Sequence, residues 1–404
     1  MKQTALNVLS NRLLDAYQGG TSFFMASSSR TLLTEGVAAE LSKQEQGGLQ
    51  TLPARAASLL AEAQRNGHSS PVLVGAIPFD PMKQAHLIVP EKVQWSGPLE
   101  FENAGVGELA GTSAAAYTIN SVPTPEAFAQ GVEQGIARLR SGELSKIVLS
   151  RALELTSQQP VDLQQLLRNL ARSNTRGYTF AADLPKQNSA GATGAKERRT
   201  LVGASPELLV RRTGRQVISN PLAGSRPRSK DPIEDQRIAA ELLISEKDLH
   251  EHAVVIEAVA AALRPFCKTL DVPSRPSLVH TETMWHLSTE VAGELADPST
   301  SSLELAAALH PTPAVCGTPT DSAREAIYEI EPFDREFYTG MVGWNDASGD
   351  GEWVVTIRCA EVYDRSLRLY AGAGVVLGSS PEGELAETSA KFRTMLRAMG
   401  LQQE

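Results

Sequence analysis

The stretch "PTPEAFAQGVEQGIARLRSGELSKIVLSRALEL", residues 123–155, joins an amphipathic helix to a buried strand. Pro125 stands early in the helical pattern and Gly142 stands late, which is the usual placement of these residues at the two ends of a helix. The apolar run after Lys146 is typical of a strand in a protein core. Because the two elements follow each other directly, we expect the helix to pack on the strand.

Segments of both kinds alternate along the rest of the chain. Residues 22–27, 31–37, 71–80, 201–220 and 351–377 have strand patterns, the run 201–220 reading as a pair of strands, and residues 7–17, 53–67, 234–266 and 381–400 have helical patterns. No Pro/Gly-rich or charged linker separates them, so residues 1–404 are predicted to form one large α/β domain. Residues 184–200 lack periodicity and are predicted to be an exposed loop between two strands.

Composition narrows the classes of function. The 42% hydrophobic and 21% charged residues are typical of a globular protein, and the net charge of −9 disfavours binding to a nucleic-acid backbone. Three widely spaced cysteines favour neither a disulfide framework nor a cysteine metal site. The N-terminus lacks a signal-peptide pattern and no window near it has the length of a membrane span, so we expect a cytoplasmic protein that does not bind membranes.

Two ionisable residues could work as a base and an acid. Lys146 opens the buried strand, and taken alone it is equally well explained as a side chain that reaches out to water. Glu207 follows Pro206 in "GASPELL" at a turn between strands, where a solvated carboxylate is more common than a functional one. If both side chains face one substrate, one can accept a proton while the other donates one, as elimination or substitution requires.

Other motifs are weak when taken singly. "NPLAGSRPR" brings Gly224 and Ser225 next to two arginines, which is typical either of a basic turn or of an anion contact. In "SEKDLHEH" the two histidines are two residues apart rather than four, which disfavours zinc. Glu387 and Lys391 in "ETSAK" have the spacing of a surface ion pair, although carboxylates from two distant helices would also suit Mg²⁺.

The segment "TIRCAEV" predicts that Arg358 lies inside a strand, where a buried guanidinium needs an anionic partner. Gly372 and Gly374 in "YAGAGVVLGS" leave room for a ligand against the backbone. Their spacing is not that of a dinucleotide-binding fingerprint, so we do not expect a nucleotide phosphate to bind there.

Taken together and in order, these motifs resemble the chorismate-utilising enzymes. The segments that carry the resemblance are "SKIVLSR", "GASPELL", "NPLAGSRPR", "SEKDLHEH", "MWHL", "LHPTPAVCGTP", "FYTGMVGW", "TIRCAEV", "AGAGVV" and "ETSAK". They span residues 120–404, and within the family they are most similar to the isochorismate synthases of the siderophore, or 2,3-dihydroxybenzoate, type. The resemblance implies a single α/β domain with two packed, antiparallel-rich β-sheets and helices outside.

The resemblance also implies a site and a reaction. Lys146 would be the base that activates water for attack at C2 of chorismate, and Glu207 would be the acid that protonates the departing C4 hydroxyl. Glu251 and Glu387 would hold Mg²⁺. The residues implied to line the substrate are Gly224, Ser225, His286, Ala314, Arg358, Gly372 and Lys391, although His286 is almost as well explained as a core histidine.

Two positions distinguish members of the family. Aminodeoxychorismate synthases often have a nucleophilic lysine where this chain has Ala223, and the ammonia-using anthranilate synthases typically lack the lysine found here as Lys146. The resemblance therefore implies that water is the nucleophile, that no glutaminase subunit is needed and that the protein is a monomer. Salicylate synthases share all the site residues and add loss of pyruvate, so the motifs leave that alternative open. A silent chorismate-binding protein and a two-metal hydrolase are disfavoured, because acid, base and both metal ligands are present and no histidine pair supports two metals.

Overall fold

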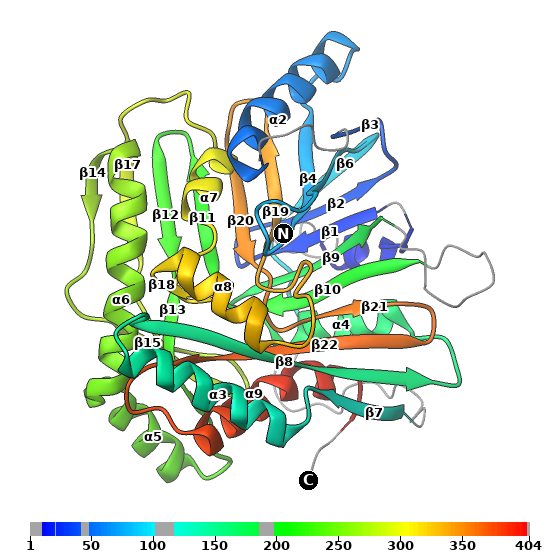
Figure 1. Cartoon of the computed structure of the whole chain (residues 1–404). Helices are drawn as coiled ribbons and strands as arrows, with labels where there is room; N and C mark the ends of the chain where they lie inside the picture. The colour runs from blue at the N-terminus through cyan, green and yellow to red at the C-terminus, as the bar shows by residue number, and fades with distance from the viewer. Residues whose placement is uncertain (1–9, 21, 42–47, 102–116, 186–197, 402–404) are drawn as a thin grey trace.

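The structure, a computed structural model, describes residues 10–20, 22–41, 48–101, 117–185 and 198–401. Two large sheets form its centre (Figure 1), and every strand pairing among the described residues is antiparallel. In order across the first sheet, the strands are β18 (Gly317–Thr318), β8 (Lys146–Ser157), β22 (Ser366–Val375), β21 (Cys359–Val362), β10 (Arg199–Ser205), β9 (Tyr178–Leu184), β1 (Ser22–Ala26), β2 (Thr31–Glu35) and β6 (Lys92–Ser96), with β7 (Tyr117–Val122) also paired to β8.

The second sheet crosses the first steeply in Figure 1. Its strands, in order, are β14 (Cys267–Asp271), β17 (Val291–Leu295), β12 (Gln216–Asn220), β11 (Leu208–Thr213), β20 (Gly351–Val355), β19 (Met341–Asp346), β4 (Val72–Ile77), β5 (His86–Val89) and β3 (Ala39–Glu40). A small third sheet contains β13 (Leu222–Pro227), β16 (Met284–Ser288) and β15 (Ser277–His280).

Most helices cover the outer faces of the two large sheets (Figure 1), whereas α5 (Pro232–Ile244) packs on the small third sheet. Apart from the helical residues 10–16, the helices are α2 (Gly48–Arg65), α3 (Pro125–Arg140), α4 (Leu163–Ser173), α5 (Pro232–Ile244), α6 (Glu246–Leu263) with the short 3₁₀ turn η1 (Arg264–Phe266), α7 (Ser302–Leu309), α8 (Thr320–Ile330) and α9 (Pro381–Ala398). None of the helices in the described part of the chain is long and apolar enough to cross a membrane.

Four apolar clusters hold these layers together. One lies between the two sheets and contains Phe180 from the first sheet and Trp344 from the second. A second packs α2, α6 and α7 on the outer face of the second sheet, and a third packs α4 and α9 on the first. The fourth joins α3 and α8 to β8 around Ile147. Each fully buried large side chain contributes about 1.5–3 kcal/mol, so the layers are held mainly by apolar burial.

The predicted pairing of helix and strand at residues 123–155 is confirmed. Thr124 caps α3 by accepting a hydrogen bond from the Ala127 N–H, and Gly142 ends the turn at a φ of 80°. The helix then packs its apolar face, including Phe128, against β8. The sequence therefore predicted both the elements and their contact.

Several predicted boundaries were wrong. The helical run 234–266 is two helices, because Ser245 adopts an extended conformation and caps α6. The helix predicted from residue 53 begins at Gly48, and residues 201–220 contribute to three strands rather than two. Leu184 and Arg199 belong to strands β9 and β10, while the centre of the predicted loop, residues 186–197, lies outside the described residues. The prediction of one domain over residues 1–404 stays a prediction.

Two of the points at which the chain passes between the two large sheets lie next to each other. One crossover carries Pro206 and Glu207 between β10 and β11, and the other carries Arg358 between β20 and β21. The two crossovers are hydrogen-bonded side by side, since the Val355 N–H donates to the Glu207 carbonyl at 3.2 Å and the Ala204 N–H donates to the Arg358 carbonyl at 3.0 Å. This arrangement places an acid and a cation together between the sheets.

The sequence predicted that Arg358 lies inside a strand, and this prediction was wrong. Arg358 has a φ of 51° in a bend between two strands. The left-handed conformation is uncommon for a residue with a side chain, and it is maintained here by the surrounding structure. The bend is needed because β20 belongs to the second sheet and β21 to the first.

A buried ion pair fixes the end of β8 that is closest to these crossovers. Arg335 is 2% exposed and donates from Nε to Glu331 at 2.8 Å. Its guanidinium also donates to the carbonyl oxygens of Val148 and Val315, both at 2.7 Å. Because a buried charge is costly without partners, this network strongly favours one arrangement of β8 relative to the segment between α7 and α8.

Candidate functional site

A cavity lies beside the two crossovers, and most of the predicted site residues line it. Its walls come from β8, β13, β16, β22, α9 and the segments around Ala314 and Thr339. The predicted residues on the wall are Glu207, Ser225, His286, Ala314, Arg358, Gly372 and Lys391. Of the four other predicted residues, Lys146, Gly224 and Glu387 belong to β8, β13 and α9, and Glu251 belongs to α6, which packs on β13. Their contacts are described below.

Glu207 is a buried acid at the edge of the cavity. Its side chain is removed from water, which raises its pKa to about 7, although the Leu222 N–H and the Lys146 and Arg358 charges favour the carboxylate. Its exposed fraction is 3%. A carboxyl with this pKa is partly protonated at neutral pH and can donate a proton there. This shift is compatible with the role of acid that the sequence resemblance implies for Glu207.

Arg358, His286 and Ser225 form a chain of polar contacts on one wall. Arg358 Nη2 lies 3.4 Å from His286 Nε2, and His286 Nδ1 lies 2.6 Å from Ser225 Oγ. Burial, together with the charges of Arg358 and Lys391, lowers the pKa of His286 well below its usual value. A guanidinium can only donate, so Nε2 of the neutral ring is the acceptor and Nδ1 carries the proton toward Ser225.

Lys146 is completely buried and lies beside Glu251. Its Nζ is 2.9 Å from Glu251 Oε1, at ion-pair distance but outside hydrogen-bond geometry. Lys146 lies on the same face of β8 as Val148, two residues further on, which lines the cavity. The sequence resemblance implies that Lys146 is a base, which must be uncharged to act, whereas the structure pairs the lysine with a carboxylate.

Glu251 is ionised in this arrangement. Burial is the largest influence on its carboxyl and opposes charge, but Lys146, Lys391 and Lys247 together outweigh it, and the pKa of Glu251 lies below its usual value. The carboxylate also packs against β22. A Cβ at Gly374 would lie only 2.3 Å from Glu251 Oε1, so glycine is needed at this position.

Glu387 and Lys391 lie one turn apart on α9. Lys391 Nζ is 2.6 Å from Glu387 Oε1 and donates to the Gly372 carbonyl at 2.8 Å. Their side chains are only 19% and 12% exposed, so this is not the surface ion pair that the spacing alone would suggest. Lys391 lines the cavity and joins α9 to β22.

Two charged residues here were not predicted from the sequence. Glu384 precedes Glu387 by one turn on α9 and is 2% exposed, and Lys247 lies 3.1 Å from its Oε1. Burial raises the pKa of Glu384, and the neighbouring Glu387 adds to this effect. The i, i+3 spacing of the two glutamates in "ELAETSAK" was the available signal, because residues with this spacing share one face of a helix.

This group of carboxylates fits a hard divalent cation. Glu251, Glu384 and Glu387 all act electrostatically on the Lys247 ammonium, so three carboxylates from α6 and α9 converge around one positive charge. Carboxylate oxygens are the ligands that Mg²⁺ prefers, and no cysteine or histidine competes within this set. The described residues contain no preformed cluster of three or more ligating groups, because lysines now separate the carboxylates.

The structure adds an aromatic wall that the sequence did not predict. Tyr338 and Tyr370 are stacked with ring centroids 4.8 Å apart, and both line the cavity. Thr339, which follows Tyr338 in the chain, also lines the cavity and has a φ of 57°, which is rare for a β-branched residue. Nothing in the sequence marks Thr339 as strained, because the strain arises from tertiary contacts.

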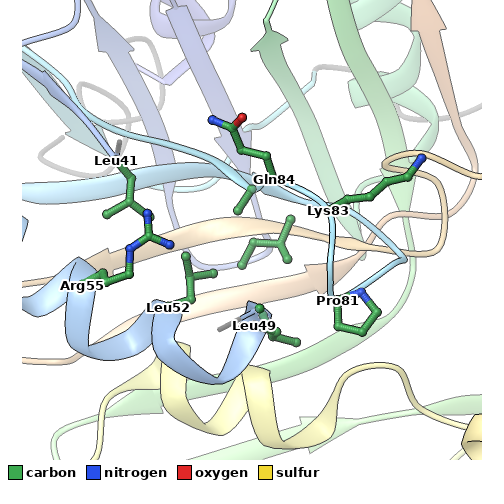
Figure 2. Close-up of a pocket in the computed structure, with 10 residues that line it drawn as sticks. Leu41, Leu49, Leu52, Arg55, Pro81, Lys83 and Gln84 are labelled. Carbon is green, nitrogen blue, oxygen red and sulfur yellow. The ribbon is translucent and has the colours of Figure 1, made fainter. Parts of the chain in front are cut away.

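Another hollow, under α2, lacks these features. Figure 2 shows leucine side chains, including Leu49 and Leu52, directed into it between α2 and the strands β4 and β5. Among the described residues, its charged lining residues are Arg55 and Lys83, and none of its described lining residues is a carboxylate. Its described lining therefore offers no acid to pair with a base, unlike the cavity at the crossovers, which has Glu207 with Arg358 and Lys391.

Comparisons with known proteins found relatives that match nearly the whole chain. The family model described as "Chorismate binding enzyme" matches residues 107–400. The isochorismate synthase DhbC of Bacillus subtilis is 63% identical over 390 residues, which are 96% of this chain and 96% of that protein. The vibriobactin-specific isochorismate synthase of Vibrio cholerae is 44% identical over 394 residues, 98% of this chain and 95% of that protein.

Solved structures give the same picture. The crystal structure described as a putative 2,3-dihydroxybenzoate-specific isochorismate synthase, DhbC, from Bacillus anthracis superposes with a TM-score of 0.91 at 56% identity, covering 97% of this chain and 100% of that one. The menaquinone-specific isochorismate synthase of Escherichia coli has a TM-score of 0.77 at 24% identity, covering 96% and 90%, and shows the shared fold.

The buried Glu207 makes the stability of the fold depend on pH. The pKa of Glu207 is about 7 in the folded state, above its ordinary value of 4.5. The protonated side chain therefore contributes fully to the free energy of unfolding below pH 4.5, and this contribution is lost as the pH rises through 7. The gap corresponds to about 3 kcal/mol. We expect Glu207→Gln to gain stability relative to the wild type between pH 5 and pH 8, measured by urea unfolding. The exposed Glu382→Gln is the control, and a difference for Glu207→Gln that does not change with pH would contradict the prediction.

Proposed function

The chain belongs to the family of chorismate-binding enzymes, and from this premise we propose that it converts chorismate into isochorismate. The observation that carries the proposal is the buried Glu207, whose pKa of about 7 makes it an acid at neutral pH, in one cavity with Arg358 and Lys391. Chorismate carries two carboxylates, so a cavity with two cations suits it. The names of the relatives support isochorismate as the product.

The reaction exchanges one hydroxyl group for another. Water adds at C2 while the C4 hydroxyl leaves as water, and no oxidant or reductant is consumed. In our proposal Glu207 donates the proton that the departing hydroxyl needs. The resulting carboxylate accepts a hydrogen bond from the Leu222 N–H and is stabilised by the nearby Lys146 and Arg358 charges. Glu207 can therefore carry either protonation state during the reaction.

Lys146 is the proposed base that takes the proton from the attacking water. It must be uncharged when it does so, whereas the structure pairs it with Glu251 at 2.9 Å. If Glu251 held a divalent cation, its attraction for the Lys146 ammonium would weaken, and this would favour the uncharged amine. Ala223 provides no competing amine, because it is a buried methyl group on β13.

We propose that Glu251 and Glu387 hold Mg²⁺, and that Glu384 lies close enough to assist. When bound, the cation supplies a positive charge that neutralises a substrate carboxylate and fixes the ring. Arg358 and Lys391 would bind the carboxylates from the cavity wall. Ser225, His286, Gly224, Ala314 and Gly372 would shape the remaining surface around the ring.

The wider setting of the enzyme is also part of the proposal. We propose that it works as a monomer in the cytoplasm, without a glutaminase subunit, and that it supplies isochorismate for 2,3-dihydroxybenzoate formation. The sequence resemblance and the named specificity of the Bacillus anthracis relative support the last point. All three cysteines have free thiols, which is compatible with a reducing compartment.

Product analysis tests the proposed reaction directly. We expect purified protein with chorismate and Mg²⁺ to form isochorismate until the two isomers reach equilibrium, as measured by chromatography, and to form none when EDTA is present. The same samples are assayed for pyruvate. Salicylate and pyruvate in equal amounts would instead identify a salicylate synthase, and unchanged chorismate would contradict both reactions.

Substitution of Lys146 separates its charge from its basicity. Lys146→Arg keeps a cation beside Glu251 but cannot lose its proton near neutral pH, whereas Lys146→Met removes the charge. We expect both variants to lose on the order of 100-fold or more in kcat, the usual contribution of a positioned base, with Lys146→Arg remaining folded by circular dichroism. An active Lys146→Arg would show that Lys146 is needed for its charge alone.

The proposed metal ligands can be tested by stability. Mg²⁺ should raise the melting temperature of the wild type, because a ligand that binds only the folded state stabilises it. We expect this increase to become smaller in Glu251→Gln and Glu387→Gln, and to persist in the control Glu382→Gln, which alters an exposed residue of the same helix. Unchanged Mg²⁺ titrations in both ligand variants would rule out the assignment.

A further inference from the structure

The strand β13 contains a bulge at the edge of the cavity. Leu222 pairs with Ser288 of β16, and Ser225 pairs with His286, so three steps along β13 face two steps along β16. The extra residue falls at Ala223 and Gly224, where Gly224 has a φ of 76°. Bulges often redirect groups next to active sites.

This bulge touches several groups of the site at once. The Leu222 N–H donates to the Glu207 carboxylate, and Ser225 Oγ lies 2.6 Å from His286 Nδ1. A Cβ at Gly224 would lie 3.1 Å from the Asp248 carbonyl of α6, so the bulge also packs closely on that helix. A small rotation of the backbone here would move the donor to Glu207 and one wall of the cavity together.

His252 of α6 contacts the bulge from the side away from the cavity. Its Nδ1 lies 3.1 Å from the Ala223 carbonyl, and its Nε2 lies 2.8 Å from Thr289 Oγ1. The residue is 3% exposed, so both ring nitrogens need partners within the protein. Because a carbonyl only accepts, Nδ1 carries the proton and Nε2 accepts from the Thr289 hydroxyl.

We propose that His252 is a positioning residue, which fixes the bulge of β13 through its Nδ1–H bond to the Ala223 carbonyl and thereby sets the substrate wall and the donor to Glu207. The inference rests on the proposed conversion of chorismate. His252 does not line the cavity and takes no part in the chemistry. His252 follows Glu251 on α6, so the same turn of helix carries a carboxylate proposed to bind Mg²⁺ and the histidine that contacts the bulge.

A purely structural role would give a different outcome. If His252 only stabilised the fold, loss of either ring contact would destabilise it similarly, because either loss leaves a buried polar atom unsatisfied. A positioning role depends on the contact with Ala223 alone. The two ring nitrogens reach different partners, so the two roles can be separated by amide side chains of different length.

Three variants make this separation. His252→Asn places an amide N–H near the position of Nδ1 and keeps the donor to Ala223, but loses Thr289. His252→Gln reaches toward Thr289 and loses Ala223. Thr289→Val is the matched control, since it removes the Thr289 contact and leaves the imidazole bonded to Ala223.

Steady-state kinetics with chorismate and Mg²⁺ give the main measurement. We expect His252→Asn and Thr289→Val to keep KM within about threefold of the wild type, and His252→Gln to raise KM about tenfold or more with a smaller change in kcat. The alkaline limb of the pH–rate profile of His252→Gln should also move upward by about half a pH unit, because Glu207 loses a donor to its carboxylate. Equal KM values and pH profiles for the Asn and Gln variants would overturn the proposal.

Hydrogen exchange distinguishes the remaining outcomes. Amides of residues 219–226 should exchange faster in His252→Gln than in the other two variants. If the Gln variant does not fold, His252→Asn decides: a tenfold higher KM despite unchanged exchange in residues 219–226 overturns the positioning role. A wild-type protein that forms no isochorismate would defeat the proposed function instead, and the exchange comparison would still report whether His252 holds the bulge.

Discussion

The site depends on one constraint, which is that ionisable groups are buried where the chain passes between two packed sheets. Glu207 and Arg358 lie on adjacent crossovers whose backbones are hydrogen-bonded to each other. The apolar cluster between the sheets excludes water from this region, and removal of water shifts the pKa of Glu207 upward to about 7. A turn on the surface with the same sequence would leave the glutamate ionised and unable to act as an acid at neutral pH. The proposed chemistry therefore follows from how the sheets pack as much as from the residue types.

Charge balance is the second organising feature. Lys146 pairs with Glu251, Lys247 with Glu384, and Lys391 with Glu387, so each of these three carboxylates has an ammonium partner. These pairs keep α6, α9 and the strands β8 and β22 together despite the cost of burying charge. They also explain how one cluster can receive a divalent cation: the carboxylates are already gathered, and an incoming cation has to displace ammonium groups instead of assembling ligands from separate surfaces.

The sequence predicted the parts of this structure that local patterns determine. The helix and strand at residues 123–155, the layered antiparallel architecture and the residue types of the site followed from periodicity and from the resemblance of ordered motifs. The sequence could not predict where individual site residues lie in the fold. Arg358 was expected in a strand, because "TIRCAEV" has strand propensity, but the change of sheet at this point imposes a bend that no local rule contains. Glu384 was overlooked because its helix spacing is equally common on solvated surfaces.

The contacts of Lys146 show why the roles of buried residues need the whole network. Its position at the start of β8 was evident from the sequence, yet its partner comes from α6, 105 positions later in the chain. Gly374 leaves just enough space on β22 for the Glu251 carboxylate to reach the lysine, as a Cβ there would lie 2.3 Å from Oε1. Thus the identity of a glycine on one strand determines whether a carboxylate from a helix can neutralise a lysine on the neighbouring strand. Such a three-element dependence gives specificity to the site, because replacement of any one group leaves another buried without its partner.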